Sequence, residues 1–214
     1  AVLRLAGAPW RAPIVRLAEG MALVSLCVGS LFAIIHVGRP DRLWELFVRP
    51  HYTSPIVWDM TAIMTYIAAT VVFLYLPLIP DMGIVRDYLG ERAGWRGVIY
   101  RALALGWRGT PAQQRVVNRG MTIIAITIIP LAVSVHSVLA WAFGLTVRVG
   151  WHSTLLAPYF VIAALLSGIA ATIVTVAAFR WAYHLEDYIT VKQFRYLGYL
   201  MLALGLTYLY MTVS

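Results

Sequence analysis

Five long apolar runs constrain the fold of this chain more than any other feature. Crossing the hydrocarbon core of a bilayer takes about 20 predominantly apolar residues in a helix. Five stretches reach that length, and we expect helices at Val15–Val37, Ile56–Leu78, Arg119–Phe143, Leu155–Tyr183 and Phe194–Val213. None shows the ten-residue alternation that marks a membrane β-strand. The sequence therefore predicts an all-α, polytopic bundle of about five transmembrane helices.

The composition supports a membrane environment and excludes other classes. Hydrophobic residues make up 61% of the 214 residues and charged residues only 12%, whereas soluble domains are nearer half and a quarter. The net charge of +8 does not predict nucleic-acid binding, because the arginines lie between the apolar runs, as they do in membrane loops. The single cysteine, Cys27, excludes a disulfide, and it is too few for a zinc or iron–sulfur site in this chain. Lipid is the expected environment.

The distribution of basic residues predicts the orientation. If residue 1 lies inside, thirteen Lys and Arg residues fall on the inner side and four on the outer side. The positive-inside rule then places the residue 1 end and the loop 80–118 in the cytoplasm of a bacterial inner membrane.

The same division gives the domain organisation. We expect a cytoplasmic-side lead-in at 1–14, a four-helix transmembrane bundle at 15–183 and a loop with a fifth transmembrane helix at 184–214. A weak amphipathic stretch near Trp95–Trp107 favours a solvated loop on the surface over a partner-docking arm. The start at Ala1 and the end inside an apolar run predict a piece of a longer protein.

Ionisable residues at membrane depth are costly and indicate function. His36 ends the first expected helix, Asp59 lies near the start of the second, His136 lies in the outer half of the third, and His152 lies in the next outer loop. The predicted topology gathers all four near the outer surface. The alternative to a functional role for His136 is a structural one, in which it bridges two helices by a hydrogen bond.

Two further sets of residues extend inward from this level. Tyr66 and Thr70 follow Asp59 by seven and eleven residues, which places them within about 20° of its helix face and up to about 16 Å deeper. Glu19 follows Arg16 by three residues, which favours an ion pair at the inner surface. If a transmembrane proton path exists in this bundle, we expect it to use Thr70 and to begin at Glu19.

A histidine and a carboxylate at one end of an apolar bundle suit quinol chemistry. A quinol loses two protons with its two electrons, and its oxygens need partners that accept protons. A haem held between His36 and His136 is an alternative, although anchors of that kind carry histidine pairs at both levels and the inner level has only His184. A transporter or a structural anchor is a third class.

Several motifs resemble the polysulfide-reductase/NrfD-like family of membrane subunits. They are Ile34–Pro40, containing His36, Gly38 and Arg39; Ser54–Asp59; Ser134–Ser137; Gly150–Thr154; and Leu185–Thr190. Within that family the chain looks most like the core membrane subunit of alternative complex III. Thr53 stands where those proteins tend to have Arg, and the stretch between His36 and Asp59 is shorter, so relatives in sulfur- or polysulfide-linked complexes remain an alternative.

The resemblance implies a function and a set of partners. It implies that the first four helices bind quinol, menaquinol being the expected form, near the periplasmic surface through His36 and Asp59. Tyr66, His136, His152 and Arg39 are expected to support them. It further implies no haem or cluster in this chain, and electron transfer to a periplasmic iron–sulfur subunit beside multihaem cytochrome c subunits and a second related membrane subunit. Further helices, forming a second bundle that the fifth helix opens, are also implied.

Overall fold

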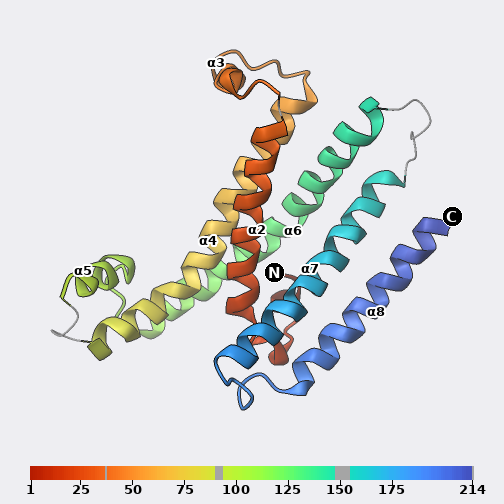
Figure 1. The fold of residues 1–214 in the computed structure, drawn as a ribbon. Helices are drawn as coiled ribbons and strands as arrows, with labels where there is room; N and C mark the ends of the chain where they lie inside the picture. The colour runs from red at the N-terminus through yellow and green to blue at the C-terminus, as the bar shows by residue number, and fades with distance from the viewer. Residues whose placement is uncertain (37, 90–93, 148–154, 214) are drawn as a thin grey trace.

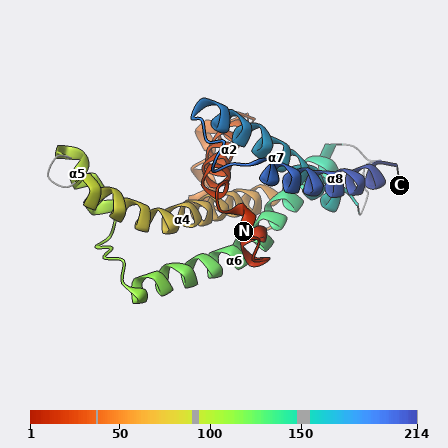
Figure 2. The same ribbon diagram turned by 90° about the horizontal axis from the view of Figure 1, so that it is seen from below.

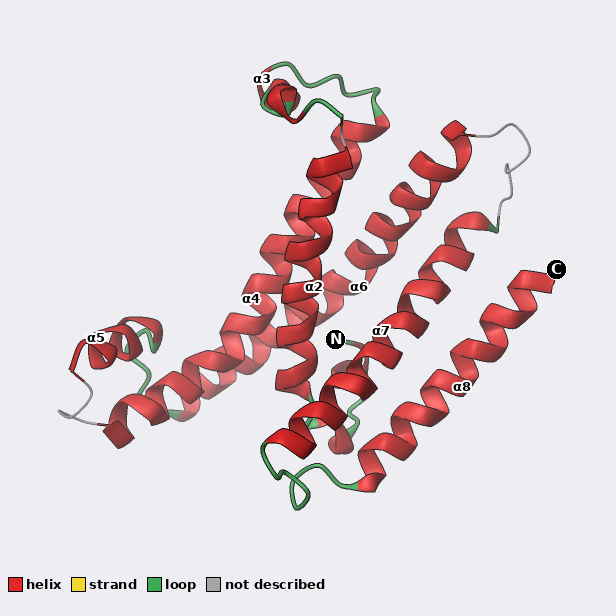
Figure 3. Ribbon diagram, in the orientation of Figure 1, coloured by secondary structure: helices red, strands yellow, loops and turns green. Residues whose placement is uncertain are grey.

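Five long helices dominate the computed structural model, which describes residues 1–36, 38–89, 94–147 and 155–213. The side chains at 33, 36, 55, 143 and 145–147 lie outside this description. The long helices are α2 (Val15–His36), α4 (Pro55–Leu89), α6 (Pro111–Val147), α7 (Leu156–Ala182) and α8 (Val191–Val213). Between and before them lie α1 (Val2–Leu5), η1 (Pro9–Arg11), η2 (Pro40–Arg42), α3 (Glu45–Val48) and α5 (Gly94–Leu103). No strand occurs among the described residues (Figure 3).

The long helices run alternately up and down. In Figure 1, α2 ends and α4 begins at the end of the molecule that also holds α3, while α4 ends at the opposite end near α5. α6 returns toward the first end, α7 runs back, and α8 runs up again beside α7. Each of the five is long and apolar enough to cross a membrane. The expected all-α, polytopic bundle is confirmed.

Four of these helices form a closed ring. α2 packs against α4, α4 against α6, α6 against α7, and α7 against α2, whereas the pairs across the ring pack less closely. Helix α8 packs on α7 outside this ring (Figure 2). Following the orientation predicted from the basic residues, we call the end at which α2 begins the inner end and the opposite end the outer end. At the inner end, Ile14, Val176, Ile189 and Leu197 form a buried cluster that ties the start of α2, the end of α7 and the start of α8 together.

Many large apolar side chains of the spans point outward. Val24, Val174 and Leu202, on three different helices, each expose more than half of their surface. A water-soluble bundle would bury such residues, and an apolar surface of this extent needs lipid or protein around it. The apolar surface around the sides of the bundle is therefore suited to contact with lipid.

The loop expected at 80–118 is largely helical, which corrects the predicted boundaries. Helix α4 continues through Pro77 and Pro80 to Leu89, α5 follows, and α6 already begins at Pro111. A proline inside a helix costs about 3 kcal/mol in isolation. Within a membrane bundle, packing and neighbouring donors offset that cost, and α4 packs along α6 over this region.

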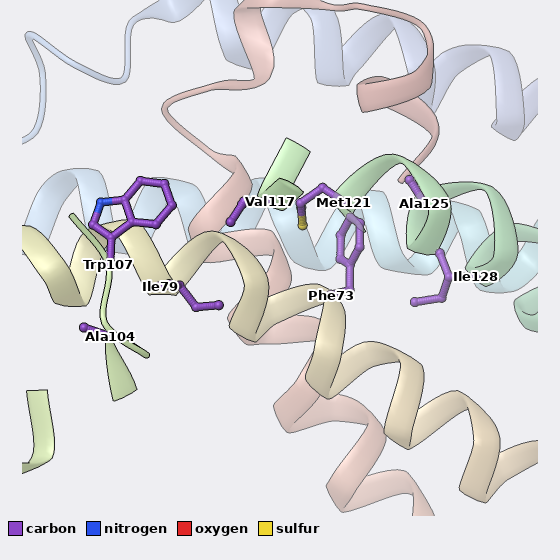
Figure 4. Close-up of a cluster of buried hydrophobic side chains, with 8 residues drawn as sticks. All are labelled: Phe73, Ile79, Ala104, Trp107, Val117, Met121, Ala125 and Ile128. Carbon is purple, nitrogen blue, oxygen red and sulfur yellow. The ribbon is translucent and has the colours of Figure 1, made fainter. Parts of the chain in front are cut away.

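A buried apolar cluster holds the extended inner ends of α4 and α6 together. Figure 4 shows Phe73 and Ile79 from α4 facing side chains of α6, with Trp107 beside them. The other members are Ala104, Val117, Met121, Ala125 and Ile128. Gly83 allows the closest approach, because a Cβ there would collide with the Trp107 ring. The chain between α5 and α6 is thus fixed against α4 rather than free in solvent.

Candidate functional site at the outer end of the bundle

The outer end is built by a helix stop and a helix start. Helix α2 ends at His36, and Gly38 follows with φ +77°, a left-handed conformation that glycine adopts without steric cost. Pro40 then begins η2. Helix α4 begins at Pro55, a favoured first position because proline lacks only a donor that would be unpaired there anyway. Two of the motifs that carry the family resemblance therefore have structural roles.

Trp58 secures the loop that precedes α4. Its Nε1 donates to the carbonyl of Tyr52 at 2.7 Å, and the backbone N–H of Ser54 donates to the carbonyl of His51 at 2.8 Å. These bonds fold the loop back over the first turn of α4. The next residue, Asp59, is thereby held at a defined position one turn inside the helix.

Asp59 carries an unsatisfied acceptor. Its side chain is partly buried, and Oδ1 is fully buried without a hydrogen-bond partner among the described residues. Leaving a buried polar atom unpaired costs about 1–3 kcal/mol, and more for a charged group. Such an atom is rare in native proteins and calls for a ligand, a water or a proton. Asp59 is therefore suited to receive a donor that approaches from inside the bundle.

Thr70 is the second unsatisfied group on α4, eleven residues or about 16 Å further in. It is 6% exposed, and its Oγ1 has no partner among the described residues. Seven other helical threonines donate to the carbonyl four residues back: Thr61, Thr65, Thr122, Thr127, Thr172, Thr207 and Thr212. Thr70 does not make this bond. Tyr66, between Asp59 and Thr70, packs against the buried cluster of α4 and α6.

His136 is oriented within its own helix. Its Nδ1 lies 2.7 Å from the carbonyl oxygen of Ala132, and because a carbonyl only accepts, Nδ1 carries the proton. In the neutral ring Nε2 is then an acceptor. The ring also packs against Phe160 of α7, with centroids 6.2 Å apart. The contact between helices is thus aromatic, and the hydrogen bond proposed as a bridge between helices is made inside α6.

The remaining outer residues are placed unequally. His36 is the last residue of α2, but its side chain lies outside the described residues, as does all of His152. The meeting of His36 with Asp59 therefore stays a prediction. Arg39 is exposed and pairs with Asp41 at 3.3 Å, each side chain being 62% exposed. It lies at the outer surface of the protein.

A charged cluster occupies the opposite end of α2. Glu19 is buried, at 8% exposed, and its Oε2 lies 3.3 Å from Nη1 of Arg16, which confirms the expected ion pair. The sequence did not reveal that Nη2 of Arg16 also donates to the carbonyl of Pro77 at 2.9 Å and pairs with Asp81 at 3.1 Å. Arg16 therefore joins α2 to α4. No local pattern could have shown this, because the partners are more than 60 residues away.

In the described part of the chain, no three His, Cys, Asp or Glu side chains gather closely enough to hold a metal ion. The two unsatisfied groups on α4 are oxygen atoms instead: Oδ1 of Asp59 near the outer end and Oγ1 of Thr70 about 16 Å further in. The fold and these groups define a multi-pass membrane protein with a polar site near one end of a four-helix bundle.

Comparison with known proteins identifies the family. The family model described as polysulphide reductase, NrfD, matches residues 3–214, and the chain belongs to that family. It is 33% identical over 163 residues, 74% of its length, to a Halobacterium salinarum protein provisionally named as a membrane subunit of dimethyl sulfoxide reductase. It is 29% identical over 166 residues, 72% of its length, to a selenate reductase subunit of Mesobacillus selenatarsenatis. These matches cover 34% and 37% of the two relatives, so the chain spans about a third of their length.

Proposed function

We propose that this chain is the quinol-binding membrane subunit of a respiratory oxidoreductase complex. The quinol head group would enter the outer end of the α2–α4–α6–α7 ring. The buried, unpartnered Oδ1 of Asp59 carries the proposal, because a quinol hydroxyl is the kind of donor that this atom lacks. Membership of the NrfD family and the names of the two reductase subunits support it.

The proposed chemistry divides between this chain and its partner. One quinol hydroxyl donates its proton to Asp59 and the other to His36, each acting as a general base. The two electrons pass to an iron–sulfur subunit at the periplasmic surface, and quinone leaves. Nε2 of His136, which is an acceptor in the neutral ring, offers a further site for a proton or a water deeper in the bundle. The apolar helices surround the ring and the isoprenoid tail.

We propose two candidate complexes in which the chain works. The names of the relatives favour a reductase of the dimethyl sulfoxide or selenate type. The sequence motifs favour alternative complex III, with multihaem cytochrome c subunits and a second related membrane subunit. Both assemblies would use one site, since in each the quinol would give up its electrons and protons through the same two oxygens. Menaquinol is the proposed form, in a bacterial inner membrane with the residue 1 end in the cytoplasm.

We propose that protons from quinol leave to the outer side. The Arg16 bonds to Glu19, Pro77 and Asp81 favour a structural role for Glu19 over one as a proton uptake point. The alternative path would run from Glu19 through Thr70. A pH-sensitive dye on each side of a reconstituted complex separates the two. Inner-side uptake that disappears in Glu19→Gln, with quinol oxidation intact, would overturn the outward route.

The decisive experiment is Asp59→Asn in the assembled complex, because the amide keeps the shape and removes the base. Loss of a positioned general base costs about 10²- to 10⁴-fold in rate, and we expect a fall in kcat of that order. Glu45→Gln, at an exposed ion pair with Arg42, is the matched control and should keep normal turnover. Wild-type quinol turnover in Asp59→Asn would refute the proposal in favour of an anchor or transporter.

A further inference from the structure

Helix α5 is a short amphipathic helix beside the inner end of α4. Its apolar face consists of Trp95, Val98, Ile99 and Leu103, which are 71%, 67%, 44% and 39% exposed. Its less exposed residues, Gly97 and Tyr100, lie on the opposite side, and Ala104 directly after the helix is fully buried against α4. The apolar face therefore points away from the protein. In both Figure 1 and Figure 2, α5 projects from the side of the bundle remote from α8.

The charges of α5 complement an anionic surface. Arg96 and Arg101 are exposed, and at 100° per residue they lie on opposite sides of the apolar face, about 85° and about 135° from its centre. The helix contains no Asp or Glu. Arg96 also lies over the ring of Trp95, with Cζ 5.7 Å from the centroid. An apolar face with basic flanks and a tryptophan is typical of a helix that lies in a membrane interface.

The depth of α5 in the bundle agrees with such a position. The carbonyl of Leu103 accepts a hydrogen bond from the hydroxyl of Tyr75 at 2.8 Å, so the end of α5 lies level with Tyr75 on α4. Tyr75 is nineteen residues, or about 28 Å, below Ile56, where the apolar span of α4 begins. The hydrocarbon core of a bilayer is about 30 Å thick. The end of α5 thus coincides with the inner boundary of the hydrocarbon.

We propose that α5 lies in the inner leaflet interface, with its apolar face among the acyl chains and with Arg96 and Arg101 bound to phosphates of anionic phospholipids. A covering protein subunit would not require two basic flanks at the boundary of the acyl chains. The proposal is independent of the quinol site. It gives α5 the role of fixing the depth of the inner ends of α4 and α6, to which it is joined through Ala104 and Trp107.

Depth measurement on the full chain, purified with its co-purifying subunits, tests the position. Cys27→Ser removes the native thiol, and a nitroxide is attached at Val98→Cys or, as a control, at Tyr88→Cys. Tyr88 is 89% exposed and about 48 Å from Ile56, beyond the headgroups of one bilayer. In nanodiscs, we expect oxygen to relax the label at 98 several-fold more than a water-soluble nickel chelate does, and the reverse at 88.

Lipid retention tests whether the two arginines of α5 bind anionic phospholipids. Native mass spectrometry counts the phosphatidylglycerol molecules that remain on the protein after release from mixed nanodiscs. We expect Arg96→Gln/Arg101→Gln to retain fewer than wild type, and the control Arg42→Gln/Arg49→Gln, at the other end of the bundle, to retain the wild-type number. A label at 98 that the nickel chelate reaches would overturn the interfacial position. A label shielded from both reagents would show that a protein partner, and not lipid, covers the apolar face of α5. If the Arg96/Arg101 variant retains as many phosphatidylglycerol molecules as wild type, the proposed contact with lipid phosphates is wrong.

Discussion

Arg16→Met should destabilise the bundle far more than the loss of an ordinary surface charge. Arg16 makes three bonds with its guanidinium: to Glu19 at 3.3 Å, to the carbonyl of Pro77 at 2.9 Å and to Asp81 at 3.1 Å. Methionine keeps the unbranched apolar stem of the side chain but makes none of these bonds. The contacts differ in burial, and burial decides how much each contributes.

The contact with Glu19 carries the largest expected effect. The Glu19 side chain is only 7% exposed, and removing one partner of a buried ion pair costs about 3–5 kcal/mol. The hydrogen bond from a charged donor to Pro77 contributes about 1.5–3 kcal/mol. Asp81 is 45% exposed, so its pair contributes at most about 1 kcal/mol. Since the three share one group and do not add, we expect a total loss of about 3–5 kcal/mol.

Equilibrium unfolding in mixed detergent micelles, followed by helical circular dichroism, measures this loss. Arg16→Met/Glu19→Gln should recover most of it, because the buried charge is removed together with its partner. Arg42→Met is the control: Arg42 lies 3.9 Å from Glu45 and both side chains are about half exposed, so a change of at most about 1 kcal/mol is expected. The reasoning is refuted if Arg16→Met behaves like Arg42→Met, or if the double variant is no more stable than Arg16→Met.

Three further substitutions test other parts of the structure, each by the same unfolding measurement. Gly83→Ala should cost about 1–3 kcal/mol, because the new methyl displaces the packed ring of Trp107; a neutral result would contradict the close approach. Trp58→Phe should cost about 1 kcal/mol through its lost bond to Tyr52; an unchanged stability would show that this bond does not secure the loop. Thr70→Val should stabilise the protein by about 1 kcal/mol, since it removes a buried, unpaired hydroxyl; destabilisation would show that Thr70 binds a water or ligand.

Hydropathy alone located the five spans within the bilayer, because the free energy of placing a segment in lipid depends on its own side chains. The start of α2 at Val15 and the end of α8 at Val213 agree with the sequence prediction. The pair of Arg16 with Glu19 was also readable, since residues three apart share a helix face. These signals are local. They also placed Asp59 one turn inside the second span, where the structure has it.

Tertiary structure decided what depends on distant segments. The sequence predicts that this helix ends at Leu78, before Pro80. Packing against α6 stabilises α4 around Pro80, and the helix continues to Leu89. Thr70 differs from seven other helical threonines through burial that no spacing reveals. Part of the loop expected beyond Pro80 instead forms α5, whose outward apolar face is set by the contacts of Ala104 and Leu103 with α4. Burial and hydrogen bonding between helices are properties of the assembled bundle, and the order of residues in one segment does not contain them.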